Sequence, residues 1–288
     1  MDPLAPVAKL DAAALLAEVN ARAGLDLDLL GRAPGGEVGA AYVRGADGRD
    51  GVLTTTPATA AEVGHTAEIL DLARRAGIPT PRYAHVVEVP GATAIVQERL
   101  PGSGPAAIDR QLVEAMVRIN ERFADLLADR PDIPAPNLYL LESGPGYCVH
   151  ESLAGYDQRT RRLLDWVRTV GAAEPGQMRG NDLVHMDFHP GNVLVDGNGA
   201  ITGVIDWHFA WRGDRLFDLV TLRFDMVRCP DDSVAVWLDD IIDAALPSPI
   251  RRLYWAHMSL RMVDWAIRHH SPSVVDGWLA LAATRMDS

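Results

Sequence analysis

Lysine is almost absent from this sequence. Lys9 is the only one among 27 basic residues, and all the others are arginine. Acidic residues number 39, which gives a formal net charge of −12 at pH 7. A surface of this sign repels the phosphates of nucleic acid, so we expect no nucleic-acid partner. It attracts cationic small molecules, although acidity also serves solubility alone.

Cysteines and long apolar runs are equally scarce. Cys148 and Cys229 are the two cysteines, and they do not form a metal-type pair, so we predict reduced thiols. No apolar run reaches the roughly 18 residues that cross a bilayer. Residues 1–19 mix acids with apolar residues and lack the pattern of a secretory signal. We therefore expect a cytoplasmic protein with no membrane partner.

Apolar residues are plentiful, at 48% of the 288 residues, which is enough for two domains or two lobes. Short alternating strands with one helix at 59–76 occupy the first hundred residues, and helical patterns such as 108–129 dominate afterwards. The proline- and glycine-rich stretch at 101–105 separates the two patterns. We predict an α+β chain with a small antiparallel-sheet lobe at 1–100 and a larger, mostly helical lobe at 101–288.

One segment, residues 183–207, carries the chemistry: LVHMDFHPGNVLVDGNGAITGVIDW. Asp187 and Asn192 are separated by a loop that contains Pro190 and Gly191, and Asp206 ends an apolar strand. Phosphoryl transfer needs one carboxylate to orient the attacking hydroxyl and accept its proton. It also needs a second carboxylate and an amide oxygen to hold magnesium, which prefers hard oxygen ligands.

The spacing His185-x-Asp187-x-x-x-x-Asn192 matches the protein-kinase catalytic loop. The form HMDFHPGN, followed by IDW, resembles the aminoglycoside phosphotransferase family. The likeness extends over most of the chain through the glycine loop, GIPTPRY at 77–83, AIVQERLPG at 94–102 and GDRLFDL at 213–219. It implies a two-lobed protein-kinase-like fold and an ATP- and Mg²⁺-dependent kinase of small molecules, with GTP as the alternative donor.

The resemblance also implies roles for single residues. Asp187 is expected to be the catalytic base, and Asn192 and Asp206 the magnesium ligands. His185 and Asp218 are expected to hold the loop by hydrogen bonds, with His189 in support. Two other interpretations stay open: a turn-rich hairpin with solvated acids, and a metal hydrolase that uses His185, Asp187 and His189 as ligands.

Glycines at 35, 36 and 39 form the loop GGEVGAAY. Gly35, Gly36 and Gly39 let backbone N–H groups approach phosphate oxygens with no Cβ in the way. A plain hairpin turn is the alternative. The loop lacks the Lys-Ser/Thr ending of a Walker motif, so a P-loop NTPase is not expected.

The hinge of the family falls on residues 97–100. Backbone groups of Gln97, Glu98, Arg99 and Leu100 are expected to hydrogen-bond adenine, and an ordinary edge strand is the alternative.

A departure from the family concerns its third-strand lysine, which holds the phosphates and pairs with a helix glutamate. Here that strand reads Val-Leu-Thr-Thr-Thr at 52–56. Either Arg44 or Arg49 replaces the lysine, or the site works without it. The helix partner is equally open, and the candidates are Glu62, His65 and Glu68. A pseudokinase that only binds nucleotide is therefore a further alternative.

Acids and tryptophans in the C-terminal lobe are candidates for binding a cationic acceptor: Asp225, Asp231, Asp232, Asp239, Asp240, Asp243, Asp264, Trp211, Trp237, Trp255, Trp265 and Trp278. The predicted function is O-phosphorylation of a cationic antibiotic, an aminoglycoside or a cyclic peptide of the capreomycin and viomycin type, conferring resistance. Macrolides, homoserine, choline and sugars are alternative acceptors.

Overall fold

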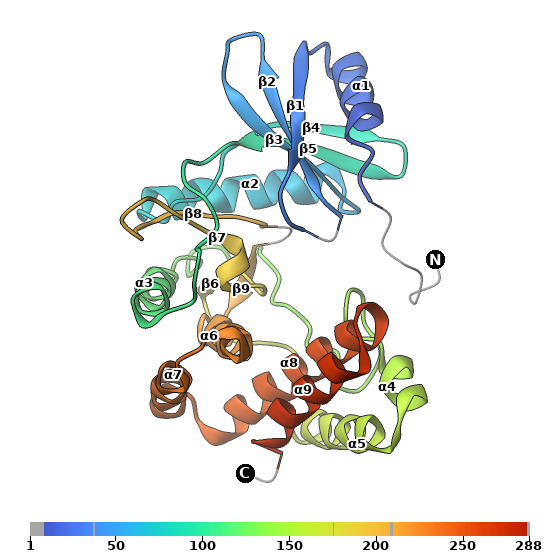
Figure 1. Ribbon diagram of the computed structural model, residues 1–288, viewed down its shortest axis with the longest axis vertical. Coiled ribbons are helices and arrows are strands. Elements are labelled where there is room, and N and C mark those ends of the chain that lie inside the picture. Colours follow the sequence, from blue (N-terminus) through green and yellow to red (C-terminus); the bar gives the residue numbers. More distant parts are fainter. Residues whose placement is uncertain (1–8, 37, 175, 208–209, 287–288) are drawn as a thin grey trace. The chain divides into compact units, whose positions relative to one another are not determined.

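The computed structural model describes residues 9–36, 38–174, 176–207 and 210–286. The chain forms two compact units (Figure 1). The N-terminal unit comprises Val7–Ala106 and Gly191–Ala210, and the C-terminal unit is built mainly from Ala107–Pro190 and Trp211–Ser288. The sequence predicted a single division near residue 100, whereas Gly191–Ala210 groups with the N-terminal sheet.

The N-terminal unit is built on a five-stranded antiparallel sheet with the order β1-β2-β3-β5-β4. Its strands are β1 (Leu27–Ala33), β2 (Ala40–Gly45), β3 (Asp50–Thr56), β4 (Tyr83–Val89) and β5 (Ala92–Glu98). This is the small antiparallel sheet that the alternating apolar pattern predicted.

A helix covers each face of this sheet (Figure 1). On one face, α1 (Ala12–Ala23) buries Leu16 and Val19 against Leu53 and Val96 of the sheet. On the other face, Val63 of α2 (Ala60–Arg75) packs with Ile95. Side chains alternate between the faces of a strand, so neighbouring positions on β3 and β5 belong to different cores.

The two helices begin where the sequence provides caps. The side chain of Asp11 accepts a hydrogen bond from the Ala14 amide at the start of α1. Thr59 and Glu62 form a reciprocal capping box at the start of α2. Glu62 is therefore used to fix the first turn of its own helix.

A hairpin, β7 (Val193–Val195) and β8 (Ile201–Val204), completes the N-terminal unit. Ser103 and Val195 exchange two backbone hydrogen bonds of 3.1 and 2.8 Å, and Thr202 Oγ1 donates to the Pro101 carbonyl. Gly102, the residue between Pro101 and Ser103, has φ +103°, and a Cβ added to it would lie 2.5 Å from Thr202 Oγ1. Hydrogen bonds to the chain that follows β5 thus explain why 191–210 groups with the sheet.

The C-terminal unit is mostly helical, as predicted. Its helices are α3 (Arg110–Glu121), α4 (His150–Tyr156), α5 (Gln158–Ala173), α6 (Leu216–Asp225), α7 (Asp232–Ala245), α8 (Ser248–His269) and α9 (Pro272–Ala283). Short 3₁₀ turns occur at η1 (Pro190–Asn192) and η2 (Met226–Arg228). The helix expected over 108–129 is shorter, because the chain turns after Glu121 and Asp125 adopts φ +51°.

Two short strands of this unit position the candidate catalytic loop. β6 (Asp182–Val184) pairs with β9 (Trp211–Gly213). The sequence pattern did not predict the strand β9. Both cysteines are free and buried, as expected. Among the described residues, no helix is both long and apolar enough to cross a membrane.

Candidate active site

The loop that follows β6 carries Asp187, and α6 holds the backbone of this loop. Asp218 of α6 is completely buried, and its two carboxylate oxygens accept hydrogen bonds from the His185 and Met186 amides, at 2.8 and 2.9 Å. Met186 has φ +68°, a conformation that L-residues rarely adopt. The predicted hydrogen-bonding role of Asp218 is therefore confirmed, and it supports a strained turn directly before Asp187.

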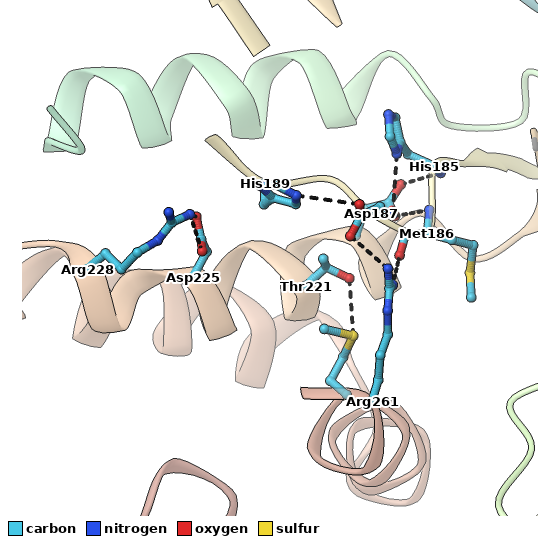
Figure 2. Close-up of polar contacts among 10 residues, drawn as sticks. His185, Met186, Asp187, His189, Thr221, Asp225, Arg228 and Arg261 are labelled. Atoms are coloured by element: carbon cyan, nitrogen blue, oxygen red, sulfur yellow. Dashed lines mark hydrogen bonds and ion pairs between the residues drawn. The ribbon is translucent and has the colours of Figure 1, made fainter. Parts of the chain in front are cut away.

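Asp187 is contacted from two sides (Figure 2). Arg261 reaches from α8 and donates to Oδ1 at 2.8 Å, and its other terminal nitrogen donates to the Met186 carbonyl. His189 Nε2 lies 3.5 Å from Oδ2. The Asp187 side chain remains 38% exposed. The carboxylate is thus fixed in orientation and still reachable by a substrate.

The charges around Asp187 determine its protonation. Burial raises the pKa of Asp187, but Arg261, His189 and His185 more than offset this and bring the pKa below its ordinary value. Asp187 is therefore ionised at neutral pH, as a general base must be. Burial lowers the pKa of His189, yet Asp187 and Asp225 raise it, with a net increase.

Asp218 behaves in the opposite way to Asp187. Burial raises the pKa of Asp218 to about 8, although the His185 and Met186 amides lower it, and the nearby charges of Asp187 and Asp214 add to the increase. The carboxyl group on the loop and the carboxyl group on α6 that holds this loop thus have pKa values that are moved apart. Such divergence is typical of acids with different roles.

The metal-hydrolase alternative finds no support in this geometry. Among the described residues, no three His, Cys, Asp or Glu side chains are grouped as a metal site requires. His185 is buried, and its Nδ1 accepts from the Asp187 amide at 3.3 Å. The ring of His185 therefore supports the loop, as predicted.

Asn192 and Asp206 lie at the open end of the β7–β8 hairpin, in the N-terminal unit. Val193 pairs with Val204, and the Ile205 amide donates to the Asn192 carbonyl at 2.9 Å. Asn192 is buried, whereas Asp206 is exposed and has φ +66°. The hairpin register therefore places Asn192 and Asp206 at the same end of the hairpin. One amide and one carboxylate supply hard oxygen donors of the kind that suits Mg²⁺, an ion that keeps most of its waters.

The glycine loop connects β1 and β2. Gly35, Gly36 and Gly39 have φ of +81°, +75° and +91°, which glycine adopts without strain. The Val38 carbonyl accepts a hydrogen bond from the Leu10 amide, which ties the loop to the segment before α1. Glu37, inside the loop, lies outside the described residues. The conformation of the loop therefore favours glycine at these positions, and its contact with phosphates stays a prediction.

Gln97 and Glu98 end β5, and Arg99 and Leu100 follow. β5 lies between β3 and β4 in the sheet, so the edge-strand alternative is wrong. The Glu98 amide donates to the Arg82 carbonyl, and the Leu100 side chain approaches Gly203 of the hairpin, where an added Cβ would lie 2.9 Å away. The hinge segment thus contacts the hairpin that carries Asn192 and Asp206.

Of the two threonines considered for the position of the missing lysine, Thr54 pairs with Ile95 and so shares the sheet face that α2 covers. Thr55 pairs with Ala94, which belongs to the α1 face. Lys9 lines a pocket with Thr55 and several α1 residues. Lys9 therefore lies on the opposite face from Thr54 and does not replace the absent cation.

The two candidate arginines are also far from the glycine loop. Arg44 pairs with Asp50 at 2.7 Å, and Arg49 pairs with Asp47 at 3.5 Å with 89% of its side chain exposed. Arg44 lies at the end of β2 and Arg49 in the turn that follows it, whereas the glycine loop joins the other end of β2. This placement does not support a surrogate arginine.

The acids proposed for acceptor binding have partners within the chain. Asp239 pairs with Arg223 and Arg285, and Arg285 also reaches Asp243. Ion pairs also join Asp225 to Arg228 and the buried Asp264 to Arg268, and Asp231 caps α7. Among the described residues, only Asp232 and Asp240 of the seven lack such partners. Trp255 and Trp278 are buried in the core, and Arg110 stacks on Trp237.

Sequence reasoning missed Arg261. It lies on α8 in the stretch YWAHMSLRMVDW, and nothing in that apolar helix indicates a contact with a loop 74 residues earlier. The one local signal is a charged residue at a helix position whose neighbours are mostly buried.

Residues 31–256 match the model of the phosphotransferase enzyme family, and this range covers most of the chain. The chain belongs to the phosphotransferase enzyme family. A search of curated protein sequences finds no match to this phosphotransferase.

Solved structures share the fold of this phosphotransferase. A thermostable mutant of aminoglycoside phosphotransferase APH(4)-Ia, in a ternary complex with AMP-PNP and hygromycin B, aligns with TM-score 0.71 and 18% identity, covering 96% of this chain and 98% of that one. The GDP and kanamycin complex of APH(2")-IIia aligns with TM-score 0.60 and 14% identity, covering 94% and 97%. Macrolide 2'-phosphotransferase MphH from Brachybacterium faecium aligns with TM-score 0.53 and 20% identity, covering 92% and 97%. The predicted kinase-like α+β fold is confirmed.

Proposed function

We propose that this phosphotransferase transfers the γ-phosphoryl group of ATP to a hydroxyl of a small-molecule antibiotic in a Mg²⁺-dependent reaction. The proposal rests on the state of Asp187. Its carboxylate is ionised, partly exposed and held on a strained loop, and its spacing to Asn192 is that of the family. A carboxylate fixed in this way can orient a hydroxyl and accept its proton.

In the proposed reaction, Asp187 accepts the acceptor's hydroxyl proton while a new bond forms between that oxygen and the γ-phosphorus. The bond from the γ-phosphorus to the bridging oxygen breaks, and ADP leaves with the electron pair. Asn192 and Asp206 would hold Mg²⁺, which supplies neutralisation of phosphate charge when bound. The hydroxyl must therefore reach Asp187 from a position in line with the breaking bond.

The two units divide the binding tasks in this proposal. The N-terminal unit binds the nucleotide through the glycine loop at 35–39 and the backbone at Gln97, Glu98 and Leu100. The C-terminal unit binds the acceptor. The AMP-PNP and GDP complexes of the two aminoglycoside phosphotransferases support a purine nucleotide as donor and keep GTP as an alternative to ATP.

For the acceptor, we infer an aminoglycoside or a related cationic antibiotic, so that phosphorylation would confer resistance. The support is the net charge of −12 and the fold shared with proteins whose complexes hold hygromycin B and kanamycin. Cyclic peptides of the capreomycin and viomycin type meet the same charge requirement.

A less cationic acceptor, such as a macrolide, is the second candidate. The specific observation is that arginines of the chain already pair with Asp225, Asp239 and Asp243. Paired carboxylates attract a substrate ammonium less strongly than carboxylates without a partner. The shared fold of the macrolide phosphotransferase is compatible with this candidate.

A substrate panel tests the function. Purified protein is incubated with ATP or GTP, with and without Mg²⁺, and with aminoglycosides, viomycin, macrolides, homoserine, choline or a sugar, and products are identified by mass spectrometry. We expect a phosphate adduct on one antibiotic class and none with Asp187→Asn. Nucleotide binding by calorimetry, with no adduct for any acceptor, would identify a pseudokinase instead.

A further inference from the structure

Arg261 makes an unusual pair of contacts for a helix side chain. One terminal nitrogen donates to Asp187 Oδ1 at 2.8 Å, and the other donates to the carbonyl oxygen of Met186. Figure 2 shows the side chain extending from α8 to these two consecutive loop residues. One guanidinium therefore contacts both the strained residue, Met186, and the carboxylate that follows it.

This arrangement depends on the shape of a guanidinium. Its planar fork presents two donors in fixed relative positions, whereas an ammonium is a single rotatable point. Arg261 is only 20% exposed, so water screens its contact with Asp187 less than at an open surface. A lysine at this position could reach one of the two acceptors but not both with the same geometry.

The contacts also make the two oxygens of Asp187 different. Oδ1 accepts from Arg261, while Oδ2 lies 3.5 Å from His189 Nε2, which is longer than a well-formed hydrogen bond. Arg261 thus holds one oxygen of the carboxylate together with the backbone carbonyl directly before it. We propose that Arg261 is a positioning residue for phosphoryl transfer, which holds Oδ1 and the Met186 carbonyl and so fixes the orientation in which Asp187 meets the acceptor hydroxyl.

This inference rests on the proposed function, because it assigns the orientation of the same base. Among the described residues, the charged groups that act on Asp187 include His185 and His189 on its own loop, Asp218 on α6 and Arg261 on α8. Asp225 acts on the loop through His189. Of these groups, only Arg261 combines a permanent positive charge with a direct bond to the carboxylate.

The test uses Arg261→Lys and Arg261→Gln, with Arg159→Gln as the matched control. Arg159 is an exposed arginine of the same unit that pairs with Asp157 and Asp276, neither of which belongs to the candidate site. We expect a kcat about tenfold lower in Arg261→Lys and about a hundredfold lower in Arg261→Gln, since small misplacement of a catalytic group costs this much. The KM for nucleotide should change less than about twofold in all three variants, as expected when only transition-state interactions are lost.

The pH profile separates positioning of the base from a general loss of structure. Without the guanidinium, burial still raises the pKa of Asp187 while its main opposing charge is gone. The acidic limb of kcat/KM should therefore move to higher pH in Arg261→Gln, less in Arg261→Lys, and not in Arg159→Gln. Equal effects in Arg159→Gln and Arg261→Gln would overturn the proposal.

A measurement without turnover keeps the inference separate from the proposed function. The side-chain carboxyl of ¹³C-labelled aspartate is titrated by NMR, and Asp187 is assigned by its absence from Asp187→Asn. We expect its titration midpoint to rise in Arg261→Gln and to stay at the parental value in Arg159→Gln. An unchanged midpoint in Arg261→Gln contradicts the role of Arg261 even when the enzyme is active. A protein that phosphorylates no acceptor yet shows the shift would instead refute the proposed function alone.

Discussion

Asp187 and Asp206 are both loop carboxylates beside a backbone of positive φ, yet the structure supports them in different ways. Asp187 follows Met186 at φ +68°, and the support comes from distant helices through Asp218 and Arg261. Asp206 itself has φ +66°, is exposed, and follows a hairpin strand that pairs with the strand next to Asn192. The candidate base is thus held by tertiary contacts, and the candidate metal ligands by local register.

This difference matches the two proposed roles. A general base must be ionised and fixed before the acceptor arrives, which a permanent cation such as Arg261 can ensure. A magnesium ligand must instead present an oxygen to a hydrated ion that also contacts the phosphates, and an exposed side chain can do this. Each role therefore fails in a different way when its carboxylate is removed.

The largest effect is expected for Asp206→Ala. Loss of this carboxylate should abolish transfer and remove the effect of Mg²⁺ on nucleotide binding, because Asp206 would hold the ion against the phosphates. Calorimetric titration of an ATP analogue, with and without Mg²⁺, measures this. Asp28→Ala, an exposed acid on β1, serves as the control and should retain parental behaviour. An unchanged Mg²⁺ requirement in Asp206→Ala contradicts the ligand assignment.

Asp187→Asn should lower turnover by at least about a hundredfold, as expected for the loss of a general base. Nucleotide affinity should stay near the parental value, in contrast to Asp206→Ala. Initial rates and calorimetry on the same preparation provide both readouts. Asp240→Asn, an exposed acid of α7 without an ion-pair partner among the described residues, is the matched control. Near-normal turnover in Asp187→Asn would remove it from the mechanism.

Asp218 gives a stability prediction instead of a catalytic one. In Asp218→Ala the amides of His185 and Met186 lose their acceptors, at a cost of about 1–3 kcal/mol for each buried amide left without a partner. Urea unfolding monitored by circular dichroism measures the free energy of unfolding. A loss below about 1 kcal/mol would show that water or another group satisfies both amides.

The pH dependence of stability sharpens this prediction. The pKa of Asp218 is about 8 in the folded protein, compared with about 3.9 in an unfolded chain. The folded state binds the extra proton between these values, so this contribution to stability is present at low pH and declines as pH rises from about 4 to about 8. Asp218→Asn cannot titrate, and its unfolding free energy should vary less over that range.

How far the sequence predicts the molecule follows the same division between local and distant contacts. The capping box Thr59–Glu62 and the spacing from Asp187 to Asn192 are local patterns, which a sequence displays directly. Contacts such as Arg261 with Asp187 join residues far apart in the chain, and only the packing of helices brings them together. Counting the acids of the C-terminal unit overestimates the carboxylates available to a cationic acceptor. A sequence does not reveal that Arg285 pairs with Asp239 and Asp243.

The smallest expected effects concern the missing third-strand cation, and they compare the two faces of one strand. Thr54 shares its face with Ile95 and α2, whereas Thr55 lies with Lys9 on the α1 face. We predict that Thr54→Lys is tolerated and lowers the KM for ATP by about threefold, or roughly 0.7 kcal/mol of added interaction. Thr55→Lys should leave that KM unchanged and lower the melting temperature, since it places a second ammonium near Lys9.

Arginine-to-alanine variants complete this comparison. Arg44→Ala, Arg49→Ala and the double variant should keep the KM for ATP within about twofold, because both side chains pair with Asp50 or Asp47 at the turn remote from the glycine loop. A tenfold increase, roughly 1.4 kcal/mol, would restore the surrogate-arginine hypothesis against this geometry. If the arginine variants keep the parental KM for ATP and Thr54→Lys alone changes it, neither arginine binds the phosphates. The glycine-loop amides and Mg²⁺ then hold the phosphates, and a lysine on the α2 face of β3 strengthens that binding.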